Sequence, residues 1–144
     1  MTKKILIPLA QGCEELEAVT LIDLLRRAGF DVVTAGLDAQ AVHCAHGTVI
    51  VPDTTVEKIL HTTFDLIVLP GGQPGTNNLN ADVRVHRILQ RHAQQEKYVG
   101  AICAAPKVLA HAGLLVNKRV TAFPGTLNDV QVAGMQLESA TVVQ

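Results

Sequence analysis

One cysteine of this chain lies at a junction that suits a reactive thiol. Cys103 follows the apolar run 99–102 and precedes a helix-like stretch with Pro106 at its start. Ala101 and Ala105 stand two positions before and after it, and a tight strand-to-helix turn that exposes a nucleophile tolerates only such small neighbours. The free N–H groups of a first helical turn favour a thiolate, so we expect a lowered pKa for Cys103. The alternative is a structural cysteine buried at a strand end.

A carboxyl group and two glycines are candidates to assist such a thiol. Glu17 lies in the first turns of an expected helix, on a face that turns apolar, and a partly buried carboxyl there could share a proton with a thiolate. A solvated surface acid is the alternative. Gly71 and Gly72 leave another expected strand with free backbone N–H groups, which make a usable oxyanion site, although Gly-Gly is also a common turn.

A further group, His43, Cys44 and His46, has the residue types of a metal site. Strand alternation places only Cys44 and His46 on one face, and the sequence supplies no third ligand, so we expect no metal. The remaining four histidines are predicted to be surface residues on helices or at helix ends: His61, His86, His92 and His111.

Composition excludes several functional classes. The 144 residues fit one domain, and 12 basic against 13 acidic residues leave a net charge of −1, so no broad field favours nucleic acid or anionic lipid. The chain has three Phe, one Tyr and no Trp, so few aromatic side chains are present on which nucleic-acid bases could stack. We therefore expect no sequence-specific nucleic-acid binding. No apolar stretch approaches the ~20 residues that span a bilayer. Three cysteines without a CxxC spacing argue against a disulfide framework. Because disulfide frameworks are typical of secreted proteins, we expect a soluble cytoplasmic protein.

The elements that must position these residues alternate along the chain. Apolar runs and turn residues predict strands at 3–10, 31–36, 66–69, 98–102 and 139–143, helices at 14–28, 83–96 and 104–112, a short helix at 55–60, and a hairpin pairing 41–44 with 48–51. This alternation favours an open, mainly parallel α/β sheet covered on both faces. Ligands bind at the carboxyl ends of such strands, so the loops at 11–13 and 70–72 should converge with Cys103.

Five segments resemble the ThiJ/PfpI superfamily, and within it the branch of the parkinsonism-associated protein deglycase and its bacterial relatives. They are Gly12–Ala18, Ile22–Gly29, Val68–Gly72, Ala101–Pro106 and Val120–Pro124. The resemblance covers essentially the whole chain. It implies a flavodoxin-like three-layer sandwich, similar to class I glutamine amidotransferases, that commonly forms a homodimer. The family continues with a further strand, a loop and a closing helix. We therefore expect residues 1–144 to be a single domain that lacks its C-terminal strand and helix, with a separate C-terminal fragment as a potential partner.

The same resemblance implies roles for individual residues. Cys103 matches the nucleophilic, oxidisable cysteine of the family, and Glu17 matches its protonated carboxyl partner. The backbone of Gly72 matches the position that stabilises an oxyanion, and we expect the backbone of Ala104 to share that role. No cofactor is expected.

Accessory positions and two departures narrow the chemistry. Cys44 and His46 match a segment near the site and the dimer interface, and His46 and Gly71 are expected accessory residues. The peptidase branch carries a His directly after the nucleophile, where this chain has Ala104, so peptidase chemistry is disfavoured. Some deglycase-branch members place a His where this chain has Phe123, which leaves Glu17 as the expected proton shuttle.

The resemblance implies a stress-response enzyme with a cysteine nucleophile. Its substrates would be α-oxoaldehydes such as methylglyoxal, handled by a glutathione-independent glyoxalase, or early glycation adducts of proteins and nucleotides, handled by a deglycase. The alternative function is a non-enzymatic redox sensor or chaperone that uses oxidation of Cys103. The sequence alone does not separate these functions, because both need the same thiol and acid.

Overall fold

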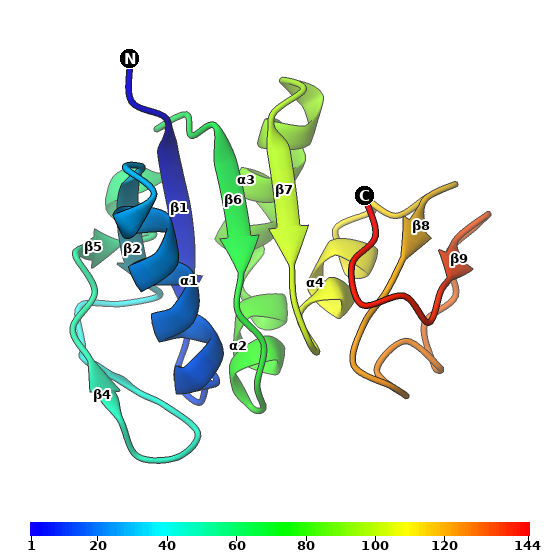
Figure 1. Cartoon of the computed structure of the whole chain (residues 1–144), viewed down its shortest axis with the longest axis horizontal. Helices are drawn as coiled ribbons and strands as arrows, with labels where there is room; N and C mark the ends of the chain where they lie inside the picture. Colours follow the sequence, from blue (N-terminus) through cyan, green and yellow to red (C-terminus); the bar gives the residue numbers. More distant parts are fainter.

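A five-stranded, fully parallel sheet forms the centre of the structure, a computed structural model that describes residues 1–144 (Figure 1). Its strands follow the order β5-β2-β1-β6-β7. Their bounds are Thr54–Thr55 for β5, Asp31–Gly36 for β2, Lys4–Leu9 for β1, Leu66–Leu69 for β6 and Tyr98–Ala101 for β7. Each neighbouring pair is parallel, so the carboxyl ends of all five strands lie at one edge.

Helices cover both faces of this sheet, which makes the three-layer sandwich. One face carries α1 (Glu15–Arg27) and the antiparallel hairpin of β3 (Val42–His43) and β4 (Val49–Ile50). The other face carries α2 (Gly75–Ala81), α3 (Val83–Gln94), α4 (Pro106–His111) and the 3-10 turn η1 (Glu57–Ile59). Figure 1 shows α1 in front of the sheet and α3 behind it. The expected flavodoxin-like α/β fold is confirmed.

Apolar side chains alternate between the two faces of the central strands, as a pleated strand requires. Ile5 and Ile7 of β1 pack with the α1 layer, whereas Leu6 between them packs with the α2–α4 layer. On β6, Ile67 packs with the α2–α4 layer and Val68 packs with the α1 layer. Strands buried on both faces form continuous apolar runs in the sequence, which is why the sequence predicts β1 and β6 well.

The helix that carries Glu17 has well-defined ends. The side chain of Glu14 caps α1 by accepting a hydrogen bond from the backbone N–H of Leu16 at 3.3 Å, and Arg26 and Arg27 lie in the last turn. Gly29 follows with a φ of +86°, a conformation that favours glycine and ends the helix. The predicted helix at 14–28 is therefore confirmed to within a residue at each end.

Several predictions for local structure are wrong or incomplete. Residues 139–143 form no strand. Instead β8 (Arg119–Val120) and β9 (Gln136–Leu137) make a small parallel sheet on the far side of α4 from β7 in the view of Figure 1. The sequence reading also lacked β5 and α2, because Thr54–Thr55 is very short and Gly75–Ala81 is rich in the poor helix formers Gly and Asn. None of the helices is long and apolar enough to cross a bilayer.

His92 corrects the expectation of a surface histidine. Its ring is fully buried in α3, where the backbone N–H of Phe64 donates to Nε2 at 2.9 Å and Nδ1 lies 2.8 Å from the Ile88 carbonyl oxygen. The two contacts assign the proton to Nδ1, because the Ile88 oxygen can only accept. Burial is the main cause that lowers the pKa of His92.

Candidate active site

The loops at the carboxyl ends of β1, β6 and β7 converge, as the sequence predicts. The backbone N–H of Glu14 donates to the Gly71 carbonyl at 3.0 Å, and the N–H of Gly75 donates to the Gly12 carbonyl at 3.1 Å. The N–H of Ile102 donates to the Leu69 carbonyl at 3.1 Å and continues the β6–β7 pairing up to the cysteine. Residues 11–13, 70–72 and 103 therefore border one small region.

Cys103 occupies the sharp turn that its small neighbours indicate. Its φ is +57°, the left-handed region that L residues with a side chain rarely adopt. The backbone N–H of Phe123 donates to the Cys103 carbonyl at 2.7 Å and so helps to hold the turn in place. Ala104 and Ala105 are buried behind it, whereas Cys103 itself is partly exposed. Of the three cysteines it is the only one that is not buried.

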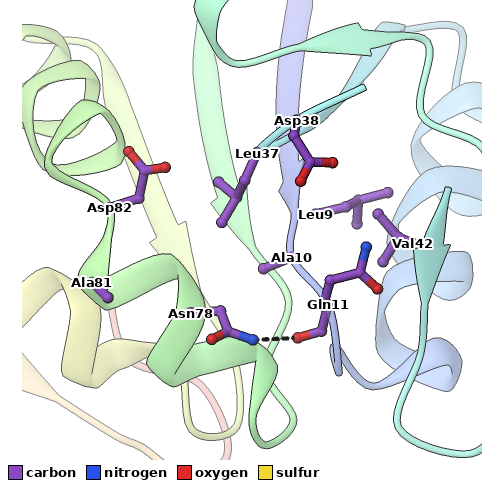
Figure 2. A pocket seen from close by; sticks show the side chains of 9 residues that line it. All are labelled: Leu9, Ala10, Gln11, Leu37, Asp38, Val42, Asn78, Ala81 and Asp82. Carbon is purple, nitrogen blue, oxygen red and sulfur yellow. Dashed lines mark hydrogen bonds between the residues drawn. The ribbon is translucent and has the colours of Figure 1, made fainter. Parts of the chain in front are cut away.

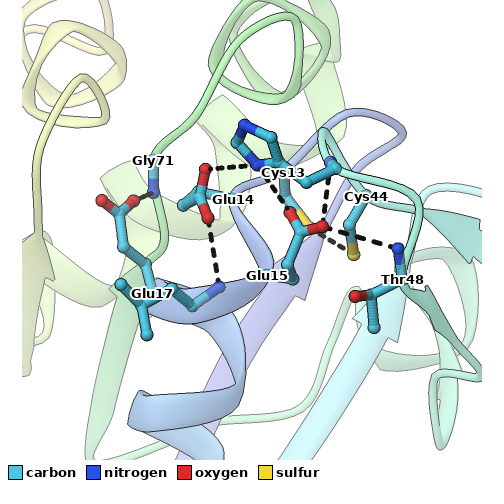
Figure 3. A network of polar contacts seen from close by, with 9 residues as sticks. Cys13, Glu14, Glu15, Glu17, Cys44, Thr48 and Gly71 are labelled. Carbon is cyan, nitrogen blue, oxygen red and sulfur yellow. Dashed lines mark hydrogen bonds and ion pairs between the residues drawn. The ribbon is translucent and has the colours of Figure 1, made fainter.

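Glu17 reaches the same region from the first turns of α1. Its Oε1 accepts a hydrogen bond from the backbone N–H of Gly71 at 2.9 Å, drawn in Figure 3. A Cβ on Gly71 would lie 2.8 Å from the Cβ of Cys103 and 2.9 Å from Oε1 of Glu17. Residue 71 must therefore be a glycine for the thiol and the carboxyl to meet across it.

The electrostatics of Cys103 overturn the expected lowered pKa. Burial raises the pKa of this thiol, and the hydrogen bond and the negative charge of the Glu17 carboxylate raise it further. The backbone N–H groups of Ala104 and Gly72 hydrogen-bond the sulfur and act in the opposite direction, but the net pKa is above the ordinary value. A carboxyl group beside the sulfur can exchange a proton with the thiol.

The backbone N–H groups of Gly72 and Ala104 are thus next to the sulfur of Cys103. Gly72 has a φ of +89°, and a Cβ at this position would lie 2.4 Å from the backbone nitrogen of Glu14. Only glycine combines this conformation with such close packing. Two converging N–H groups can stabilise negative charge that develops on an attacked carbonyl oxygen.

His46 lies in the turn between β3 and β4, and its ring contacts two carboxylates at the start of α1, those of Glu14 and Glu15. Its Nδ1 is 3.2 Å from Oε2 of Glu14 and 3.4 Å from Oε2 of Glu15. Glu15 is held by backbone N–H groups, because its Oε1 accepts from His46 at 2.8 Å and weakly from Thr48 at 3.5 Å (Figure 3). These hydrogen bonds keep the pKa of Glu15 below its usual range although burial acts to raise it. One nitrogen or oxygen atom of each of Glu14, Glu15 and His46 could coordinate a metal ion, and these atoms lie within 4.8 Å of one another.

The sequence reasoning missed a pair of buried cysteines. The sulfur atoms of Cys13 and Cys44 are 3.7 Å apart, beside Glu15 in Figure 3. Cys44 lies two residues after Val42 of β3, and both side chains are buried. This alternation was the signal in the sequence that the Cys44 thiol would point inward. Its partner could not be found from spacing, because Cys13 lies 31 residues earlier in the chain.

A pocket lies elsewhere, between the ends of β1 and β2 and helix α2 (Figure 2). It has a volume of about 320 Å³, and its lining includes Leu9, Gln11 and Asp38. The side-chain amide of Asn78 donates to the Gln11 carbonyl at 2.8 Å on one side of it. None of the predicted site residues lines this pocket.

Comparisons with known proteins agree with this geometry. The model of the DJ-1/PfpI family matches residues 3–144. Protein dj-1beta of Drosophila melanogaster is 40% identical over 125 residues, which are 86% of this chain and 67% of that protein. The glutathione-independent glyoxalase DJR-1.2 of Caenorhabditis elegans is 38% identical over 117 residues, which are 81% of this chain and 61% of that protein.

Solved structures share the same fold. A crystal structure of the DJ-1 superfamily protein STM1931 from Salmonella typhimurium superposes with a TM-score of 0.93 and 34% identity, covering 99% of this chain and 77% of that one. This chain matches only part of the length of its sequence relatives. It spans 67% of the Drosophila protein and 32% of each of two DJ-1 homologs of Arabidopsis thaliana.

Proposed function

The chain belongs to the DJ-1/PfpI family, and from this we propose that it is a cysteine-dependent enzyme that converts α-oxoaldehydes without glutathione or another cofactor. The observation that carries the proposal is the meeting of Cys103 and Glu17 across Gly71, with the Glu17 carboxylate held at 2.9 Å by the Gly71 N–H. A relative named as a glutathione-independent glyoxalase supports the same chemistry.

The thiol and the carboxylate suit the first step of such a reaction. As the sulfur of Cys103 attacks the aldehyde carbon of methylglyoxal, a carbon–sulfur bond forms and the thiol proton passes by way of Glu17 to the aldehyde oxygen, which gives a hemithioacetal. The raised pKa of the thiol means that Glu17 must act as a base during the attack. The N–H groups of Gly72 and Ala104 face the region where the aldehyde oxygen becomes negative.

Glu17 would then move protons between the two substrate carbons. The proton of the former aldehyde carbon leaves through an enediol, and a proton is returned to the neighbouring ketone carbon, which gives a thioester on Cys103. Water cleaves the thioester, releasing lactate and the free thiol. Methylglyoxal plus one water therefore equals one lactate, with no external oxidant or reductant. Early glycation adducts, as deglycase substrates, carry a related carbonyl and are the second substrate class we propose.

Lactate production from methylglyoxal in glutathione-free buffer tests this proposal. We expect Cys103→Ser to abolish turnover and Glu17→Gln to reduce kcat by about 100-fold or more, since both groups act in the chemical steps. Glu96→Gln changes an exposed acid at the end of α3 and is the matched control, which should retain wild-type activity. Turnover that survives the Cys103 substitution would exclude the mechanism.

A second function, redox sensing with chaperone activity, is favoured by the exposure of Cys103. It is the one thiol of three that is not buried, and a protonated Glu17, together with two backbone N–H groups beside the sulfur, can hydrogen-bond a sulfinate. Mild peroxide should then add two oxygen atoms at Cys103 before either buried cysteine reacts. First oxidation elsewhere, as read by peptide mass spectrometry, would remove the basis for this function.

We also propose that the protein acts as a homodimer in the cytoplasm. On the outer side of α1, Leu16 is 73% exposed and Leu24 57% exposed. A shallow groove of about 300 Å³ between α1 and β4 has apolar walls that include Val19 and Val51. Apolar surface of this kind favours a second copy of the chain. Three free thiols suit a reducing compartment.

A further inference from the structure

We propose that Cys13 and Cys44 are a second redox site, which forms a reversible intramolecular disulfide by exchange with a small-molecule disulfide such as oxidised glutathione. The two thiols are free, buried and 3.7 Å apart between sulfur atoms. Neither has a role in the proposed reaction at Cys103. Each is the only side-chain hydrogen-bond partner of the other, so a disulfide would leave no buried donor without an acceptor.

Backbone hydrogen bonds hold the segments that carry the two cysteines side by side. The N–H of Gly12 donates to the His43 carbonyl at 2.8 Å, and the N–H of Ala45 donates to the Cys13 carbonyl at 2.9 Å. The sulfur atoms must approach from 3.7 Å to about 2.05 Å for a disulfide to form. We expect rotation of the two side chains to provide this approach.

The surroundings decide how the exchange proceeds. Both sulfurs pack in the apolar cluster under α1, and burial, as the largest cause, raises the pKa of Cys13 to about 12 and that of Cys44 above its ordinary value. Cys44 is 7% exposed and Cys13 is fully buried, so Cys44 is the thiol that an external disulfide reaches first. Because only thiolates attack disulfides, the rate should rise with pH.

The exchange balances in two steps. The Cys44 thiolate attacks one sulfur of oxidised glutathione, which forms a mixed disulfide and releases one glutathione thiolate. The Cys13 thiolate then attacks the Cys44 sulfur, which forms the protein disulfide and releases the second glutathione thiolate. The two protein thiols lose two electrons and two protons, and oxidised glutathione gains them. Excess reduced glutathione or dithiothreitol reverses both steps.

The bond would join two parts of the candidate site. Cys13 directly precedes Glu14 at the start of α1, and Cys44 directly follows β3, just before the turn that carries His46. The disulfide would therefore fix the His46 turn against the carboxylates that its ring contacts. It would also close a long loop, so the oxidised protein should unfold at a temperature roughly 5–15 °C above that of the reduced protein.

The test uses the Cys103→Ser variant, so that the exposed thiol cannot contribute. The protein is incubated with oxidised glutathione at pH 8.5, unfolded, and treated with iodoacetamide. We expect both remaining cysteines to resist alkylation, the intact mass to fall by two hydrogen atoms, and a non-reducing digest to hold a Cys13–Cys44 peptide pair. Dithiothreitol should restore two alkylatable thiols.

Single substitutions in the same background check the order of the steps. Cys13→Ser should stop at a glutathione adduct on Cys44, and Cys44→Ser should take up almost no glutathione while folded. Two freely alkylated thiols after oxidation, a stable glutathione adduct on the parent variant, or disulfide-linked dimers would each overturn the proposal. Because the readout is mass and not turnover, these outcomes are independent of the lactate assay.

Discussion

Cys103 and Glu17 are one coupled unit, in which the state of the carboxyl decides the reactivity of the thiol. The Glu17 carboxylate raises the pKa of Cys103, so removal of its charge should lower that pKa. We expect Glu17→Gln to react with iodoacetamide several-fold faster than the parent protein at pH 8, although its turnover falls. Slower alkylation of Glu17→Gln would instead mean that Glu17 carries a proton and donates it to a thiolate.

His92 should make stability depend on pH. Its pKa is lowered in the folded protein, mainly by burial, whereas an unfolded histidine titrates near 6.5. The unfolded chain therefore binds the extra proton as pH falls below about 6.5, and the free energy of unfolding decreases. Hydrogen-bonded carboxylates with a lowered pKa, such as Asp53 and Asp82, lose their stabilising effect only at lower pH, below about 4.

Urea unfolding between pH 7.5 and 4.5 isolates this histidine. We expect the parent protein to lose stability across that range, and His92→Gln, which keeps a donor and an acceptor but cannot titrate, to start less stable and show a flatter dependence. An equal slope in both proteins would assign the loss to other groups.

At the scale of elements, the loop after β6 brings α1 and the strand-to-helix turn of β7 together. A methyl group at Gly71 would lie 2.8–2.9 Å from Cys103, Glu17 and the Ile102 carbonyl. We expect Gly71→Ala to reduce lactate formation at least 10-fold, because even a small displacement separates the thiol from its base. The added methyl should also cost about 1–3 kcal/mol of unfolding free energy.

Gly100→Ala is the matched control for that substitution. A Cβ at Gly100 in β7 would lie 3.7 Å from Val68, an ordinary contact distance. We expect wild-type turnover and nearly unchanged stability by urea titration. If both alanine variants lose activity equally, the close approach at Gly71 is not what positions the site.

At the scale of the whole molecule, the exposed apolar side chains on α1 and beside β4 predict self-association. Val51 is 79% exposed and lines the groove between α1 and β4. Burying a carboxylate there without a partner is costly, so we expect Val51→Glu to shift a dimer to a monomer in size-exclusion chromatography with light scattering.

Val83 provides the control for this interface. It is 59% exposed at the start of α3, on the opposite face of the sheet. Val83→Glu should leave the dimer intact, and the acid also suits the first turn of a helix. A parent protein that elutes as a monomer, or a Val51→Glu variant that stays dimeric, would place the contact surface elsewhere.

The sequence by itself determined the framework of this protein. Apolar runs predicted four of the five central strands, and helix ends followed from local signals such as Glu14, Asp82 and Gly29. The turn at Cys103 followed from its small neighbours, because its strain depends on nearby residues alone. These features are local, and local sequence therefore specifies them.

Only the tertiary structure decided the features that depend on distant residues. Cys13 meets Cys44, Glu17 meets Cys103, and His92 is enclosed beside Phe64, in each case across at least 28 residues of chain. The pKa of Cys103 shows why this matters. Local N–H groups favour a lower value, but burial and the Glu17 charge, both products of the fold, raise it. Charges and solvent exclusion act through space, so the three-dimensional arrangement sets the chemistry of the site.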